Sequence, residues 1–112
     1  MKAAEVKKLR VRDEWCWHCG ATANLVPHHR ANRGAGGSKV LDNLQNVILV
    51  CASFNGEMES DPAVAAWARE LGLKLSRYSS PGNALFDNYA KRWYLLDTKG
   101  NKHETEPPSY LI

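Results

Sequence analysis

The sequence predicts a single α+β domain in which two short strands precede two helices. A Cys-x-x-Cys knuckle occupies residues 16–19, the segments 25–29 and 46–51 are short and apolar, and helical patterning begins just after the second segment. A length of 112 residues is typical of one domain, and 44% hydrophobic residues can form a modest core. We therefore expect one compact unit.

Residues 1–13 are predicted to form a basic helical arm. Lys7, Lys8, Arg10 and Arg12 crowd this stretch, although the net charge of the chain is only +3. The stretch lacks the apolar region of a secretory signal, and no run in the chain approaches the roughly 20 apolar residues that span a bilayer. We therefore expect a cytoplasmic protein with no membrane partner.

Three cysteines, Cys16, Cys19 and Cys51, are the candidate ligands of a structural zinc ion. An odd number of cysteines in a cytoplasmic chain argues against a disulfide framework, and the knuckle ends in Gly20. A second Cys-x-x-Cys would place its last thiolate at position 54, which is Phe54. The site would be completed by His18, another side chain or water. The alternative is a turn without metal, in which the thiols are buried.

Two extended segments are expected to pair with each other. In Leu25–His29, Pro27 excludes a central helix, and Asn46–Cys51 is rich in β-branched residues. The glycine-rich stretch 30–39 between them is predicted to be a structured surface loop.

Two helices and a small β-hairpin are expected in the second half of the chain. Helical patterning covers residues 54–60, and Ser60-Asp61-Pro62 supplies an N-cap and an N1 proline for a second helix that stops at Gly72. The stretch 73–77 alternates in polarity, and residues 92–97 are typical of a strand that leads into a glycine turn. Residues 101–112 are predicted to be a C-terminal tail.

The order of these segments brings together side chains suited to hydrolysis. Two adjacent histidines end the first strand, Asn46 begins the second, and Asn55 lies in the first turn of the helix. An imidazole can act as a base near neutral pH, and an amide oxygen favours hard cations such as Mg²⁺ or Mn²⁺. The pattern indicates metal-dependent cleavage of a phosphodiester.

These residues resemble the HNH endonucleases of the His-Me finger, or ββα-metal, superfamily. The resemblance lies in Pro27-His28-His29-Arg30, in the NVILVC of Asn46–Cys51, and in Asn55, which stands where the family has a final His. The preceding Cys-x-x-Cys fits the zinc-tethered variety of the family. The loop glycines and the CASFNGEME of residues 51–59 are similar to small HNH proteins encoded by phages of actinobacteria.

The resemblance implies the fold and the domain organisation. It covers residues 14–100 as an HNH nuclease domain, with a ββα core at about 24–60, after the arm and before the tail. The expected architecture is a ββα-metal core with an N-terminal knuckle and a C-terminal helix plus hairpin.

The resemblance also implies a role for each site residue. His29 is the general base that activates water, and Asn46 holds the backbone between the strands so that His29 points at that water. The catalytic Mg²⁺ or Mn²⁺ would be bound by His28, Asn55 and Glu59. The products implied are a 3′-hydroxyl and a 5′-phosphate.

Double-stranded DNA is the expected partner. Arg30 or Arg33 would hold the scissile phosphate, and Lys39 adds a third cation to the same loop. Because of its resemblance to phage proteins, the chain is also expected to work beside a phage terminase.

Two other functions remain open at the level of sequence. One is a noncatalytic DNA-binding or packaging accessory protein that keeps the HNH scaffold. The other is a zinc-ribbon interaction domain in which the histidines are zinc ligands.

Overall fold

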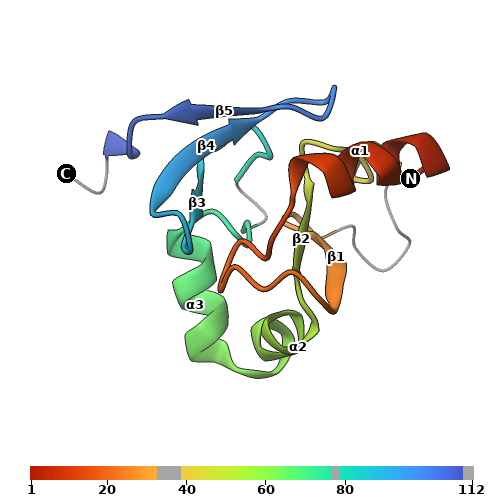
Figure 1. The fold of residues 1–112 in the computed structure, drawn as a ribbon. Helices are drawn as coiled ribbons and strands as arrows, with labels where there is room; N and C mark the ends of the chain where they lie inside the picture. The colour runs from red at the N-terminus through yellow and green to blue at the C-terminus, as the bar shows by residue number, and fades with distance from the viewer. Residues whose placement is uncertain (33–38, 77–78, 110–112) are drawn as a thin grey trace.

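The computed structural model describes residues 1–32, 39–76 and 79–109 and has the predicted α+β class. In Figure 1, strands β1 (Leu25–His29) and β2 (Val47–Cys51) lie beside α1 (Ala3–Arg12), and α2 (Ala52–Ser60) lies below them. The predicted order of strand, strand and helix is present. Within the described residues, no helix is long and apolar enough to cross a membrane.

Strand β2 is the centre of the fold because both of its faces are covered. It pairs antiparallel with β1, with Leu25 opposite Cys51 and His29 opposite Val47. Successive side chains of a strand point to opposite faces. Ile48 and Val50 accordingly enter the main core cluster, whereas Val47 and Leu49 enter a second cluster. The uninterrupted apolar run of β2 therefore serves two cores.

Helix α1 packs on this second cluster, although the sequence analysis predicted an arm. Leu9 is fully buried against Leu44, Val47 and Leu49. The buried Arg12 guanidinium binds the Asp13 carboxylate and donates to the carbonyl oxygen of Val47. The helix is thus held to the body of the protein by apolar contacts and by the buried hydrogen bond from Arg12 to Val47.

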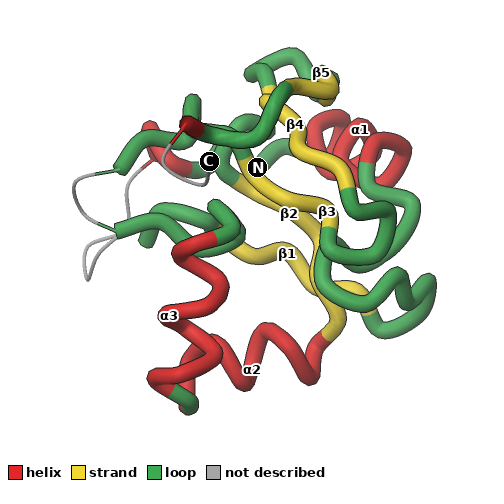
Figure 2. Tube along the Cα trace, turned by 90° about the vertical axis from the view of Figure 1, so that its left-hand side faces the viewer, coloured by secondary structure: helices red, strands yellow, loops and turns green. Residues whose placement is uncertain are grey.

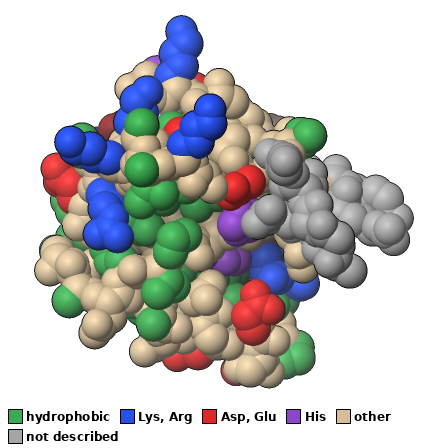
Figure 3. All heavy atoms as spheres, turned by 90° about the vertical axis from the view of Figure 1, so that its right-hand side faces the viewer, with side chains coloured by type: hydrophobic (Ala, Val, Ile, Leu, Met, Phe, Trp, Pro, Cys, Tyr) green, Lys and Arg blue, Asp and Glu red, His purple; other side chains and the backbone are tan. Residues whose placement is uncertain are grey.

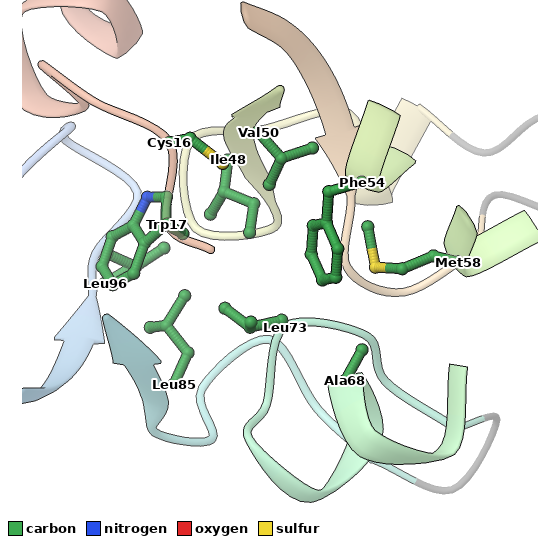
Figure 4. Packing of buried hydrophobic residues seen from close by; sticks show 10 residues of the cluster. All are labelled: Cys16, Trp17, Ile48, Val50, Phe54, Met58, Ala68, Leu73, Leu85 and Leu96. Carbon is green, nitrogen blue, oxygen red and sulfur yellow. The ribbon is translucent and has the colours of Figure 1, made fainter. Parts of the chain in front are cut away.

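Helix α3 (Pro62–Glu70) begins and ends where the sequence predicted. The Asp61 carboxylate accepts a hydrogen bond from the N–H of Ala63, and Pro62 is the first helical residue. Gly72 has a φ of 71°, and a Cβ there would lie 2.2 Å from the carbonyl oxygen of Ala84. Side chains of α2, α3 and both sheets meet in the main core, which Figure 4 shows around Trp17, Phe54 and Leu73.

The C-terminal β element is larger than the predicted hairpin. Strands β3 (Leu85–Asp87), β4 (Arg92–Leu96) and β5 (Lys102–Thr105) form an antiparallel sheet in that order (Figure 2). The strand β5 lies inside the segment predicted as a tail. Residues 73–76 do not form a strand; the N–H of Leu75 donates instead to the carbonyl oxygen of Arg30.

Candidate functional site

The knuckle and the end of β2 assemble a group of three thiols and one imidazole. Cys16, His18 and Cys19 come from the knuckle, and Cys51 comes from the last position of β2. One ligand atom of each lies within 4.8 Å of the others, and the sulfur atoms of Cys19 and Cys51 are 3.8 Å apart. This group can hold a metal such as zinc, and His18 is the fourth member of the group.

Backbone N–H groups point at the sulfur atoms. Cys16 Sγ accepts from the N–H of His18 at 3.3 Å and from that of Cys51 at 3.1 Å, and Cys51 Sγ accepts from the N–H of Phe54 at 3.4 Å. Burial raises the pKa of the Cys16 thiol to about 11, whereas a hydrogen bond from the Ala21 backbone lowers the pKa of Cys19. Thiolates in such a pocket need a cation beside them.

His18 is held in the orientation of a ligand by its neighbours. Its ring stacks on Phe54 with centroids 4.1 Å apart and an interplanar angle of 5°, and Trp67 packs edge-on against it. His18 Nδ1 is buried and has no hydrogen-bond partner. Burial lowers the pKa of His18, which favours the neutral imidazole that metals bind. Phe54, in place of a fourth cysteine, thus supports the imidazole instead.

A separate cavity brings together four of the residues implied by the resemblance. His28 and His29 reach it from β1, and Asn55 and Glu59 reach it from α2, where they lie one helical turn apart. Its volume is about 330 Å³, and it is also lined by Pro27, Asn32 and Lys74. Among the described residues, the tight clustering of ligand atoms seen at the knuckle does not recur here. A cation in this cavity would therefore need the Asn55 oxygen and water as ligands.

His28 is buried and fixed by one backbone contact. Its Nε2 lies 2.9 Å from the carbonyl oxygen of Leu73, so this nitrogen is the protonated donor and Nδ1 keeps the lone pair. Burial lowers the pKa of His28 to about 4, so the ring is neutral at pH 7. A neutral imidazole oriented by a carbonyl oxygen is the usual state of a metal ligand.

His29 pairs with a carboxylate that the sequence analysis missed. Its Nε2 lies 3.0 Å from Oδ1 of Asp42, and both side chains are about a quarter exposed. Asp42 follows the short 3₁₀ helix η1 (Lys39–Leu41) and also binds the amino group of Met1. In the sequence, Asp42 marks only the boundary before the second strand, so nothing singled it out as a partner of His29.

Asn46 makes the backbone contacts that the resemblance implies. It is fully buried, its Oδ1 accepts from the N–H of Ala31 at 2.8 Å, and its Nδ2 donates to the carbonyl oxygens of Ala31 and Leu41. The side chain therefore ties the residues just after His29 to the segment before β2. It lines no part of the cavity.

Arg30 cannot hold a phosphate, which corrects the prediction from sequence. Its side chain is buried, with 1% of the residue exposed, and its guanidinium donates to backbone carbonyl oxygens on two connecting segments, the one before β2 and the one between α3 and β3; these belong to Gln45, Gly72, Pro81 and Asn83. Burial lowers the pKa of Arg30 to about 9, so it stays protonated at pH 7 and bound to those carbonyls.

The other predicted DNA contacts are placed only in part. Arg33 lies outside the described residues, and Lys39 begins η1. Among the described residues, the cation that lines the cavity is Lys74, which follows α3 and was not predicted. The sequence does not indicate that Lys74 belongs to the cavity, because it lies 44 positions after Arg30 and reaches the cavity only in the folded protein.

Figure 3 shows the face of the molecule that carries histidine atoms at its centre, with acidic side chains near them and with Lys and Arg side chains gathered in its upper part.

No family model, no curated protein and no solved structure matches this chain.

Proposed function

We propose that this protein is a divalent-metal-dependent DNA endonuclease of the HNH type. The observation that supports the proposal most is that His28, His29, Asn55 and Glu59, chosen from two distant stretches of sequence, line one cavity. The buried bridge made by Asn46 is the second support.

His29 would act as the general base. Because Asp42 holds Nε2, His29 Nδ1 is the nitrogen left to accept a proton from water. The resulting hydroxide attacks phosphorus, the bond from phosphorus to the 3′ oxygen breaks, and that oxygen takes a proton from solvent. The products are a 3′-hydroxyl and a 5′-phosphate.

The donor set of the cavity fits a hard cation. His28 Nδ1, the Asn55 amide oxygen and the Glu59 carboxylate are one nitrogen and two oxygen donors, and they suit Mg²⁺ or Mn²⁺. When bound, such an ion offsets the negative charge that develops on the phosphate and the leaving oxygen. Lys74 adds a positive charge on the cavity wall and replaces Arg30 as the candidate phosphate contact.

Nicking of supercoiled plasmid tests the proposal. We expect Mg²⁺ or Mn²⁺ to support nicking, EDTA to stop it, and His29→Ala to abolish it while DNA binding remains. The matched control is His103→Ala, because His103 is an exposed histidine on β5, away from the cavity, whose side chain bonds to the turn residue Asp97. Plasmid that stays supercoiled with every divalent ion would refute the enzyme; if DNA is nevertheless bound, the noncatalytic accessory role replaces it.

We also propose that Cys16, His18, Cys19 and Cys51 bind one structural zinc ion. The unpartnered, buried Nδ1 of His18 supports this, because a buried nitrogen without a hydrogen bond needs another partner. We expect one zinc per chain by elemental analysis, loss of zinc in Cys19→Ser and weaker zinc binding in His18→Ala, with His103→Ala as the control. Zinc that survives Cys19→Ser but is lost in His28→Ala would instead support the zinc-ribbon hypothesis.

A further inference from the structure

A groove between α1 and the turn from β4 to β5 brings three lysines together. Its volume is about 530 Å³; Lys7 and Lys8 line it from the helix, and Lys99 lines it from the turn. Val11, which is 73% exposed, lies at the same place. The function proposed above makes no use of this groove.

The three ammonium groups lack partners within the protein. In the part of the chain that the structure describes, no hydrogen bond or ion pair engages Lys7, Lys8 or Lys99 through its side chain. Two other surface cations are paired by contrast: Lys91 donates to Asn88, and Arg92 binds Glu104. Three unpaired positive charges around one groove attract an anion with several charges.

The wall formed by the turn is held firmly in place. The Asp97 carboxylate accepts hydrogen bonds from the N–H of Lys99 at 2.9 Å and from that of Asn101 at 3.0 Å. Gly100 has a φ of 95°, and a Cβ there would lie 3.4 Å from Cβ of Lys8. The turn therefore packs against the stem of Lys8, so the spacing of the lysines is set before an anion arrives.

We propose that this lysine groove binds the phosphate backbone of duplex DNA. The proposal rests on the function proposed above, because it assigns a second contact surface for the same substrate. Figure 3 shows Lys and Arg side chains with apolar atoms between them on the face that also carries histidine atoms, so one duplex can cover both. Lysines are point charges that bind phosphates without reading bases, so the contact is independent of sequence.

The test measures duplex binding in EDTA, where no cleavage occurs. A fluorescent duplex is titrated at several salt concentrations with wild type and with the triple variant Lys7→Gln, Lys8→Gln and Lys99→Gln. Each lost phosphate contact reduces the magnitude of the slope of log K against log salt by about 0.9, so the triple variant should lose about 2.7 of that magnitude and bind the duplex more weakly than wild type at low salt. Glutamine favours helices as lysine does, so α1 should persist.

The control is the double variant Arg69→Gln and Lys91→Gln, which removes cations on α3 and after β3 and should keep a larger slope than the triple variant. A triple variant with the wild-type slope would overturn the proposal. The proposal would also be overturned if the lysines were needed for binding anionic vesicles or single-stranded RNA while the protein did not bind duplex DNA.

The failures of the two proposals are distinguishable. His29→Ala should keep wild-type affinity for the duplex while losing nicking. Lysine-dependent binding without nicking by the wild type would refute the nuclease and support the groove. Nicking by the triple variant at the wild-type rate under limiting DNA would refute the groove and support the nuclease.

Discussion

Replacing Asn46 by alanine removes three hydrogen bonds at once, two of them buried and the third partly buried. The side chain accepts from the N–H of Ala31 and donates to the carbonyl oxygens of Ala31 and Leu41, at distances between 2.8 and 3.0 Å. Asn46→Ala leaves those three backbone groups without their partner, and each buried unsatisfied group costs about 1–3 kcal/mol. Since neighbouring groups relax, we expect the free energy of unfolding to fall by about 3–5 kcal/mol.

Urea unfolding followed by tryptophan fluorescence measures this loss. For a domain of this size, about 4 °C of melting temperature corresponds to each kcal/mol, so thermal unfolding should shift down by roughly 12–20 °C. The control is Asn83→Ala, because the Asn83 side chain is exposed and only its backbone carbonyl binds Arg30. That variant should stay within about 0.5 kcal/mol of wild type.

The outcome separates a structural bridge from a dispensable side chain. If Asn46→Ala cost less than about 1 kcal/mol, the idea that Asn46 fixes the segment after His29 would be refuted. If the variant is as unstable as expected, the loss of nicking that accompanies it is explained by disorder after β1 rather than by direct contact with the substrate.

Three further predictions concern charged residues. Asp42→Asn should lower the nicking rate at saturating DNA by about 10–100-fold with DNA affinity unchanged, because His29 loses the carboxylate that holds Nε2; an unchanged rate would contradict that role. Arg30→Met should lower the free energy of unfolding, measured by urea denaturation, by about 3–5 kcal/mol because four carbonyl oxygens lose their donor. A stable variant that binds DNA more weakly would instead restore Arg30 as a phosphate contact. Hydrogen bonds hold the pKa of Asp97 well below its usual range; the bond from His103 has the largest effect, and those from Asn101 and Lys99 add to it. The Asp97 carboxylate therefore stabilises the fold above about pH 4, and this stabilisation is lost as the pH falls. The difference in melting temperature between wild type and Asp97→Asn should therefore shrink below about pH 4, and a constant difference would argue against it.

Features set by neighbours in sequence were predictable. The cap at Asp61, the stop at Gly72 and the run of β2 depend on residues a few positions apart, and the structure has them where they were expected. The pairing of Cys16 with Cys19 was also predictable, because the Cys-x-x-Cys spacing is a local signal, and Cys51 was the one cysteine left in the sequence to join them.

Features set by distant contacts were not predictable. Arg30 looked like a surface cation until Gly72, Pro81 and Asn83 surrounded it with carbonyl oxygens from a part of the chain more than 40 residues away. Helix α1 looked like an arm because basic residues crowd it, yet the buried Leu9 docks it, with help from the buried Arg12. One well-placed apolar side chain was too weak a signal to outweigh a pattern of lysines.

The register of the β1–β2 ladder decides which histidine bonds to Leu73 and which pairs with Asp42. A slip of one residue moves every side chain of a strand to the other face, so it would exchange the positions of His28 and His29. The ladder is pinned against such a slip at both ends, by the Asn46 amide that bonds Ala31 just after β1 and by the hydrogen bond from the N–H of Ala52 to the carbonyl oxygen of Asn24 just before it. Two identical neighbours in the sequence therefore have different chemical environments, because hydrogen bonds made by other residues fix the register of the strand that carries them.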